Sequence, residues 1–446
     1  MINDTDTIAA IASGSGKAGI GVVRVSGPAV ATIAQQITGI TLDVRHAHYL
    51  PFLDADGEVL DEGIALRFAA PHSFTGEDVL ELQGHGGAVV LDLLLARVIE
   101  LGARAANPGE FSERAFHNNK LDLSQAEAIS DLISSSSAAA ARAAVRSMRG
   151  EFSQAIAAIN EELVAIRVWL EAALDFSEEE IDFLADSQLQ KRATVLIEQF
   201  DQLLSRAEQG QRLRDGMNVV IAGAANAGKS SLLNCLSGDD TAIVTDIAGT
   251  TRDVLRADIT IEGVPLHLVD TAGLRDTNDV VEKMGIERAR KAIEEADHVI
   301  VLLDATAPRL PELPSLDENS MSVVLNKTDL VSASHVQALT AKYNAALCIS
   351  VATGQGIPEF KAHLLALSGH DQQIEGVYIA RRRHVEAIES ARQATHDALM
   401  RLNDNLMPEL AAEELRLAQQ SLQLITGRFD SEDLLGEIFS SFCIGK

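Results

Sequence analysis

Cysteine, positive charge and long apolar runs are all scarce in this chain of 446 residues. Its three cysteines, Cys235, Cys348 and Cys443, show no metal-type pairing, so the sequence predicts neither a disulfide framework nor a zinc site. No uncharged apolar run reaches about 18 residues, so no transmembrane helix is expected. The opening residues, MINDTDTIAA, lack a basic segment followed by an apolar stretch, which argues against a signal peptide. The expected location is the reducing cytoplasm, with no membrane partner.

The chain is strongly acidic. Lys and Arg total 37 against 65 for Asp and Glu, which gives a formal net charge of -28 at pH 7. Such a chain repels nucleic-acid backbones as a whole, so a nucleic-acid substrate would need a local basic patch or a basic partner. Hydrophobic residues make up 46% and charged residues 23%, which excludes the disordered and collagen-like classes.

Four stretches that differ in composition and in the spacing of apolar residues predict a multidomain protein. Residues 1–120 mix short β-like runs with one helix at Ala88–Leu101, which indicates an α+β domain. Residues 121–212 and 371–446 are helical in composition, and helices are expected at Ser135–Ala141 and Glu151–Leu174. Residues 213–370 alternate apolar strands with helical segments, which predicts a mostly parallel sheet wrapped by helices. The simplest layout is a helical domain interrupted by an inserted α/β domain, with the two helical flanks packed together.

A glycine-rich loop follows the apolar strand expected at Asn218–Ala222. Residues Gly223–Ser230, GAANAGKS, fit the pattern G-x-x-x-x-G-K-[ST], and a helical segment comes next. The glycines let backbone N–H groups wrap phosphates, Lys229 adds positive charge at the outer phosphates, and Ser230 offers a hydroxyl to Mg²⁺. The alternative is a chance match in a loop, which the flanking strand and helix make a poor explanation.

Further segments follow in the order expected of a GTP-binding domain. Asp270 begins the run DTAG, where its carboxylate would hold Mg²⁺ through water and the Gly273 amide would sense the γ-phosphate. The run GTTRD at Gly249–Asp253 offers a threonine for Mg²⁺ in a switch loop. The run NKTD at Asn326–Asp329 follows another apolar strand. Four such pieces in order predict a GTPase domain.

Asp329 predicts a preference for guanine. Its carboxylate can accept two hydrogen bonds from N1–H and N2–H₂ of guanine, and adenine has no matching pair of donors. Ser350 lies where GTPases place a Ser-Ala-Lys turn that supports the base, although Val351 and Ala352 depart from that pattern.

Two features of the expected GTPase domain narrow its mechanism. The residue after DTAG is Leu274, not a glutamine that could orient the attacking water, so another group must do this. Asn226 lies inside the phosphate loop, where its side-chain oxygen could hold a monovalent cation that neutralises charge beside the phosphates. The alternative for Asn226 is an amide that only stabilises the loop, because asparagine commonly bonds its own backbone in turns.

Several longer runs carry a resemblance to a known family. They are the phosphate loop, TDIAGTTRD at Thr245–Asp253, DTAGLRDTNDVVEKMGIERA at Asp270–Ala289, SFTGEDVLELQGHGG at Ser73–Gly87, PGEFSERAF at Pro108–Phe116, and the final CIGK. In these runs the chain resembles the MnmE family, also called TrmE, of tRNA modification GTPases. The match covers essentially the whole chain and includes the inserted-domain layout.

The resemblance implies a homodimer built through N-terminal domains that bind a tetrahydrofolate derivative, either 5-formyl or 5,10-methylene, as one-carbon donor. It implies a heterotetramer with the FAD protein MnmG. Together the two proteins would add a carboxymethylaminomethyl or aminomethyl group to carbon 5 of the wobble uridine, position 34, of certain tRNAs. GTP hydrolysis would depend on potassium and drive association of the G domains across the dimer.

The resemblance also assigns individual residues. It places K⁺ on Asn226, Thr245, Ile247 and Thr250, Mg²⁺ on Ser230 and Thr251, the attacking water on Glu282, and folate on Arg24, Glu81, Lys120 and Lys446. With the motifs, it implies GTP contacts from Asn226, Ala227, Gly228, Lys229, Ser230, Ser231, Thr245, Asp246, Ile247, Ala248, Gly249, Thr250, Thr251, Asp270, Thr271, Ala272, Gly273, Asn326, Lys327, Asp329 and Ser350.

Simpler interpretations stay open for two of these positions and for Cys443, which the resemblance implies is the family's cysteine near the active region. Glu282 could be an exposed glutamate at the start of a helix. Lys446 could be a frayed terminal lysine. Cys443, between two apolar residues, could be an inert packed thiol.

Two other functions compete with the family's. One is a switch GTPase in ribosome assembly without modification chemistry, but such a switch needs neither the 120-residue N-terminal domain nor the CIGK end. The other is a helical scaffold with a degenerate G domain, against which the intact Lys229, Ser230 and Asp329 argue.

Overall fold

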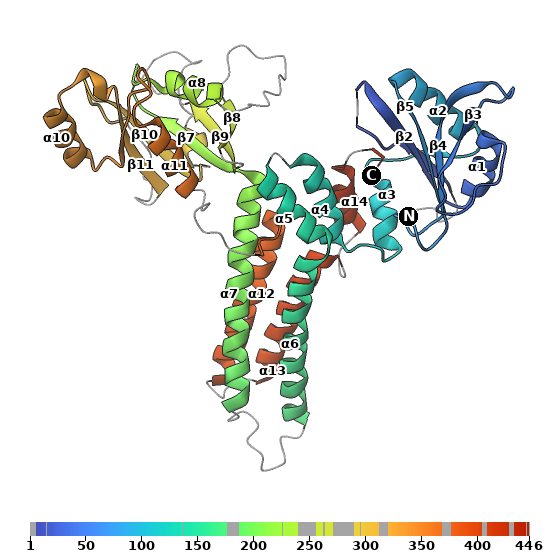
Figure 1. Ribbon diagram of the computed structural model, residues 1–446. Helices are drawn as coiled ribbons and strands as arrows, with labels where there is room; N and C mark the ends of the chain where they lie inside the picture. Colours follow the sequence, from blue (N-terminus) through green and yellow to red (C-terminus); the bar gives the residue numbers. More distant parts are fainter. Residues whose placement is uncertain are drawn as a thin grey trace, which may run out of the picture. The chain divides into compact units, whose positions relative to one another are not determined.

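The structure is a computed structural model that divides into two compact units (Figure 1). Unit 1 comprises Met1–Ser130, Ser147–Phe200 and Glu386–Lys446, and unit 2 comprises Asp131–Arg146 and Asp201–Val385. The residues that the structure describes are 6–14, 16–135, 137–175, 187–224, 226–239, 256–261, 264–270, 290–294, 296–311, 320–367, 376–403, 408–427, 432–442 and 444–445.

Unit 1 begins with a six-stranded sheet in the order β3-β4-β5-β2-β1-β6. Its strands are β1 (Ile8–Ile11), β2 (Ala18–Ser26), β3 (His48–Leu53), β4 (Val59–Phe68), β5 (Val79–Gly86) and β6 (Arg104–Ala105). Neighbours are antiparallel except β1 and β6. Helices α1 (Val30–Thr38) and α2 (Ala88–Glu100) pack on one face, where strand and helix side chains form one core. Mixing short strands with helices, this region is the α+β arrangement that the sequence predicts.

The sequence predicted one helix in this region, and the structure adds α1 and α3 (Glu110–His117). Helix α1 reads VATIAQQIT, in which β-branched residues lower the intrinsic helix propensity. It forms because Val30, Ile33 and Ile37 line one face and are fully buried against the sheet. This packing outweighs the local preference, which is why composition alone misses the helix.

The helical part of the chain contributes seven helices to the described residues. They are α4 (Leu123–Ser134), α5 (Ala138–Met148), α6 (Glu151–Asp175), α7 (Ser187–Asp215), α12 (Arg382–Asn403), α13 (Pro408–Thr426) and α14 (Glu432–Ser440). Within unit 1, α13 runs along α6, and Arg167 donates a hydrogen bond to Gln419 across 252 residues of sequence (Figure 1). The two helical flanks therefore pack together, as the insertion layout predicts.

The sequence also predicted helical structure at Ser135–Ala141, and this is wrong at its start. Helix α5 begins only at Ala138, because the Ser137 hydroxyl accepts a hydrogen bond from the Ala140 amide at 3.0 Å and caps the helix. None of the described helices is both long enough and apolar enough to cross a membrane.

The inserted part of unit 2 has a sheet in the order β12-β11-β10-β7-β9-β8. Its strands are β7 (Met217–Ala222), β8 (Arg256–Ile261), β9 (Val264–Asp270), β10 (His298–Asp304), β11 (Met321–Asn326) and β12 (Leu347–Cys348). Only the β8–β9 pair is antiparallel, so the mostly parallel sheet predicted from the sequence is confirmed.

Helices cover both faces of this sheet. Helices α8 (Lys229–Asp239) and α11 (Ile357–Leu367) share a core with Val219 and Ile221 of β7. Helix α10 (Ala333–Tyr343) joins the opposite core, which contains Val220 and Ala222. Successive side chains of β7 therefore enter the two cores in turn. Because both faces of the strand are buried there, these four residues form an unbroken apolar run in the sequence.

A buried polar cluster lies where β10 and β11 begin. The Ser322 hydroxyl is 2.8 Å from Nε2 of His298 and 3.0 Å from Nε2 of His363 on α11. Burial lowers the pKa of both histidines below their ordinary value of 6.5, and the neighbouring His363 lowers that of His298 further. Both imidazoles are therefore held neutral in the folded domain.

The first prediction concerns the stability of this domain in acid. Because the folded-state pKa values are depressed, the stabilisation is present above pH 6.5 and is lost as the pH falls below it. Scanning calorimetry between pH 8 and pH 5 should show the unfolding temperature of the domain falling. The double variant His298→Asn and His363→Asn should fall less steeply, whereas His335→Asn, at an exposed position, should behave as wild type. A double variant with the wild-type slope would contradict the assignment.

Candidate functional site

The phosphate loop connects the carboxyl end of β7 to the first turn of α8. Lys229 is only 8% exposed, and its Nζ donates to the carbonyl oxygens of Gly223 at 2.9 Å and Ala224 at 3.3 Å. The ammonium group is therefore held within the curve of the loop. Ser230 and Ser231 follow in the first turn of α8, and both are exposed. Backbone amides at the start of this helix and the lysine charge together suit a bound phosphate.

Two positions of the loop adopt the left-handed backbone region. Asn226 has φ +65° and is exposed, and Gly228 has φ +99°. A Cβ on Gly228 would lie 2.3 Å from Nδ2 of Asn326, so only glycine fits there. The geometry leaves the Asn226 amide at the surface of the loop, where its oxygen is available to a ligand.

Asn326 joins the phosphate loop to the turn at residues 350–353 that follows β12. Its buried side chain donates from Nδ2 to the Ala227 carbonyl at 2.8 Å and accepts from the Val351 amide at 3.2 Å. The amide therefore stabilises both loops from the end of β11. Ser350, fully buried, accepts a hydrogen bond from the Thr353 amide at 3.3 Å and so shapes the second turn.

Lys327 and Asp329 follow at the same edge of the sheet. Lys327 adopts φ +61°, and its Nζ lies 2.6 Å from a carboxylate oxygen of Asp304 at the end of β10. Burial raises the pKa of Asp304, but the hydrogen bonds from Lys327 and Thr306 outweigh it and hold that pKa below its ordinary value. Asp329 is exposed within the short 3₁₀ turn Thr328–Leu330, so its carboxylate is free to meet a base.

For Asp270 only the backbone is described, and several other assigned residues lie outside the described ranges. Asp270 is the last residue of β9, and its backbone pairs with Ile221 of β7, which places it beside the phosphate loop. Those that lie outside the described residues are Thr245, Asp246, Ile247, Ala248, Gly249, Thr250, Thr251, Thr271, Ala272, Gly273, Glu282, Cys443 and Lys446. Of the assigned cation ligands, the structure therefore describes Asn226 and Ser230. Both offer oxygen atoms, which suit Mg²⁺ and K⁺.

The second site assigned from the sequence lies on the sheet of unit 1. Arg24 of β2 and Glu81 of β5 are cross-strand partners, and Nε and Nη2 of Arg24 lie 3.0 and 2.9 Å from Oε1 of Glu81. The guanidinium also lies over the rings of Phe74 and Phe111, at 5.4 and 5.9 Å from their centroids. A charged pair set against aromatic rings can bind a flat, polar heterocycle.

Lys120 is placed by a separate contact. Its Nζ donates to the Pro71 carbonyl at 3.0 Å, and its side chain lies beside the turn at Gly76. The same loop, residues 71–78, carries Phe74, so Lys120 and Arg24 each approach this loop.

The C-terminal segment reaches this sheet within unit 1. Phe439 of α14 packs on Phe116, and a Cβ on Gly109 would lie 2.3 Å from the Phe439 carbonyl oxygen. Gly445 has φ +94°, and a Cβ there would lie 2.3 Å from the carbonyl oxygen of Ile11. The residue next to Lys446 is therefore packed against β1, the strand that pairs with the Arg24 strand.

The sheet face that carries Arg24 and Glu81 also exposes apolar side chains. Tyr49 of β3 pairs with Ile64 of β4, and both are exposed, at 74% and 37%. On the same sheet, His85 is 73% exposed, and its Nδ1 lies 2.7 Å from Asp61. No sequence motif assigns these residues a role, because the pairing of strands β3, β4 and β5 brings them to one sheet.

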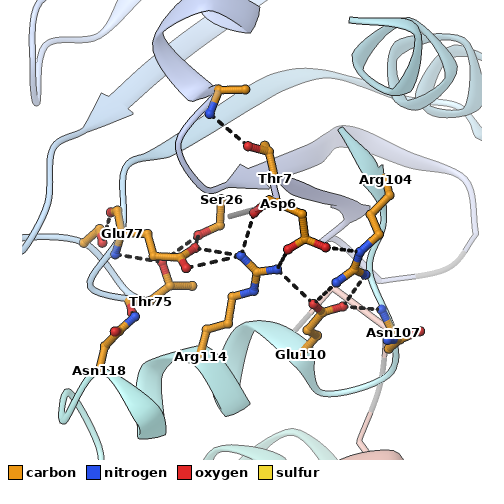
Figure 2. Close-up of polar contacts among 12 residues, drawn as sticks. Asp6, Thr7, Ser26, Thr75, Glu77, Arg104, Asn107, Glu110, Arg114 and Asn118 are labelled. Carbon is orange, nitrogen blue, oxygen red and sulfur yellow. Dashed lines mark hydrogen bonds and ion pairs between the residues drawn. The ribbon is translucent and has the colours of Figure 1, made fainter. Parts of the chain in front are cut away.

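A network of charges surrounds Arg114 of α3 (Figure 2). Arg114 is 2% exposed and donates to Asp6 at 2.7 Å, to Glu110 at 3.0 Å and to Glu77 at 3.2 Å. Burial raises the pKa of Glu110, but hydrogen bonds from Arg104, the Asn107 amide and Arg114 hold it below its ordinary value. The network fixes α3, and with it Phe111, against the start of the chain.

Matches to known proteins cover nearly the whole chain. The family profile described as "MnmE helical domain" matches residues 123–443, and "GTP-binding protein TrmE N-terminus" matches residues 7–120. The chain is 55% identical over 451 residues to the tRNA modification GTPase MnmE of Pseudomonas aeruginosa strain UCBPP-PA14, covering 99% of each chain. It is 52% identical over 455 residues to the protein of that name from Stutzerimonas stutzeri strain A1501, covering 100% of each.

Among solved structures, the FeoB G-domain from Methanococcus jannaschii is 24% identical. The likeness covers 34% of this chain and 98% of that chain, with a TM-score of 0.27.

The second prediction tests base recognition by Asp329. Asp329→Asn should lower the affinity for GTP by roughly two orders of magnitude or more, because the amide cannot accept both guanine hydrogen bonds. The amide can donate to the xanthine oxygen, so the affinity for XTP should rise in the same variant. Titration with fluorescent GTP and XTP analogues measures both. If the variant still prefers GTP, Asp329 does not contact the base.

Proposed function

The chain belongs to the family of the tRNA modification GTPase MnmE, and from this membership and the two sites we propose how its parts divide the work. As a family member it hydrolyses GTP and acts in tRNA modification. In our proposal, residues 213–370 form the inserted G domain, residues 1–120 bind folate and dimerise, and residues 121–212 with 371–446 form the helical domain between these activities.

The proposed reaction adds a carboxymethylaminomethyl or aminomethyl group to carbon 5 of the wobble uridine of certain tRNAs. A tetrahydrofolate derivative supplies the one-carbon unit, and the FAD protein MnmG is the partner. The observation that carries this proposal is the Arg24–Glu81 pair, set against two aromatic rings in the same chain as the phosphate loop. A GTPase that only switches has no use for such a site.

In the folate site, each residue has a chemical role. Glu81 accepts hydrogen bonds from the amino-substituted edge of the pterin, and Arg24 holds that carboxylate in its orientation. Lys120 and Lys446 add positive charge for the carboxylates of the folate tail. The packing of Gly445 against Ile11 supports the role of Lys446, because it holds the end of the chain beside β1.

In the nucleotide site, Lys229 and the loop amides hold the phosphates, and Asn326, Lys327, Asp329 and Ser350 shape the base pocket. Ser230 and Thr251 would hold Mg²⁺, which neutralises charge on the phosphates. Asn226, Thr245, Ile247 and Thr250 would hold K⁺. Glu282 would orient the attacking water, since Leu274 stands where other GTPases have glutamine. The exposed amide of Asn226, held in the left-handed region, supports its role.

The proposed assembly is a homodimer that binds two copies of MnmG in the cytoplasm. Exposed Tyr49 and Ile64, on the face that also carries Arg24, support dimerisation through this sheet, because exposed apolar side chains gain by burial. The net charge of -28 supports a second point: MnmG, rather than this chain, carries most of the positive charge that holds tRNA.

The third prediction concerns the monovalent cation. GTP turnover should be several-fold faster in K⁺ than in Na⁺ of equal concentration, since the cation neutralises charge that develops in the transition state. Asn226→Ala should remove that difference. The matched control is Asn344→Ala, an exposed asparagine in the same backbone region at the end of α10. If Asn226→Ala is still stimulated by K⁺, the cation lies elsewhere.

The fourth prediction tests the proposed function itself. In cells that lack the gene, nucleoside analysis should find no modified wobble uridine, and the wild-type chain should restore it. Deletion of Cys443–Lys446 should restore none, while the purified variant keeps GTP turnover within about twofold of wild type. Normal modification by the truncated chain would remove Lys446 from the site.

A matched pair of arginine variants separates the folate site from general damage to the sheet. Arg24→Ala should weaken binding of 5-formyltetrahydrofolate, measured by titration calorimetry. Arg67→Ala removes an equally half-buried, ion-paired arginine from the same sheet and should bind as wild type. Equal losses in both variants would show damage to the sheet and refute the role of Arg24.

A further inference from the structure

One buried carboxylate ties together the two places where the chain enters and leaves the α/β part of unit 2. Asp131 of α4 is 4% exposed. It accepts hydrogen bonds at 2.9 Å from Nε of Arg214, one residue before α7 ends, and at 2.9 Å from Nη2 of Arg381, just before α12 begins. Asp215 pairs with Arg214 as well, so two carboxylates balance two guanidinium groups.

The incoming helix α7 and the outgoing segment before α12 also approach each other closely through their backbones. A Cβ on Gly210 of α7 would lie 1.6 Å from the carbonyl oxygen of Tyr378, so no larger residue fits between them. Val377, Tyr378, Ile379 and Ala380 are all buried. Residues 377–380 of the outgoing segment are therefore packed, and Tyr378 lies directly against the incoming helix α7.

The junction continues directly into the sheet. Nε2 of His267 on β9 lies 2.9 Å from the Asp215 carbonyl oxygen. Gly216 has φ +73°, and a Cβ on it would lie 2.8 Å from the carbonyl oxygen of Pro265. Strand β9 runs from Pro265 at this contact to Asp270, about 17 Å away at the rise of an extended strand. One end of β9 thus meets the junction, and the other end leads into the γ-phosphate-sensing segment proposed above.

We infer that Asp131 is a positioning residue that couples GTP hydrolysis to tRNA modification, by holding α4 and both chain crossings as one rigid junction at the foot of β9. A rigid junction transmits a displacement of β9 to α4, whereas a loose one absorbs it. The inference rests on the proposed function, because it assigns a role in linking the two activities. Asp131 touches neither nucleotide nor folate residues in the described contacts, so its loss spares the chemistry of each site.

Two variants perturb the junction independently. Asp131→Asn keeps the shape of the side chain and removes the negative charge that holds Arg214 and Arg381. Gly210→Ala keeps the charges and forces α7 away from Tyr378. Arg381→Lys, the conservative variant, keeps a cation beside Asp131. The control is Glu414→Gln, which removes a comparable ion pair with Arg401 between α12 and α13.

The readout is the yield of modified uridine per GTP hydrolysed. Asp131→Asn and Gly210→Ala should keep kcat and KM for GTP within about twofold of wild type, while the yield falls at least about tenfold. Arg381→Lys and Glu414→Gln should keep the wild-type yield. An unchanged yield overturns the inference, and so does a parallel loss of GTP affinity, stability and modification, which would mark a purely structural role.

A distance measurement tests the junction even if the wild-type chain modifies no tRNA, an outcome that would refute the proposed function. Spin labels on Arg142→Cys of α5 and Glu359→Cys of α11, both exposed positions of unit 2, are introduced after the native cysteines are replaced by alanine. The distance distribution should be narrow, and Asp131→Asn should widen it about twofold. A width that does not change in Asp131→Asn overturns the inference.

Discussion

The burial of one guanidinium group constrains the arrangement of unit 1. Arg114 cannot be removed from water unless anions surround it, and Asp6, Glu77 and Glu110 come from three separate parts of the chain to do so. This requirement fixes α3 against the sheet. Helix α3 in turn presents Gly109 and Phe116 to α14, and α14 leads to Gly445 on β1. A charge balance in the N-terminal region thereby determines where the last residues of the chain lie.

The nucleotide site depends on a different constraint, the common edge of a parallel sheet. Strands β7, β10 and β11 all end at this edge, so the phosphate loop, Asp304 and Asn326 meet there. The single amide of Asn326 then links the glycine-rich loop before α8 to the turn that follows β12. Because one side chain bonds both segments, neither can move far without the other.

The sequence predicts the G domain well because its signals are local. The phosphate loop and NKTD each lie directly after an apolar strand, and the topology then brings them together without further information. Composition failed for α1, which is stabilised by burial of Ile33 and Ile37, and for the break before α5, which depends on one serine. The Asp131 junction could not be foreseen, because Asp131 and Arg381 are 250 residues apart and carry no motif.

The pairing of α6 with α13 has a consequence for the order in which the chain folds. During synthesis, β7 through α11 emerge before α13 exists, and their contacts lie within one continuous stretch. The partner of α6, by contrast, lies 252 residues further along at the Arg167–Gln419 contact. Contacts of such separation form late and slowly. On the ribosome the inserted domain therefore folds before α6 and α13 pair, so a nascent chain acquires its nucleotide site before its helical domain is complete.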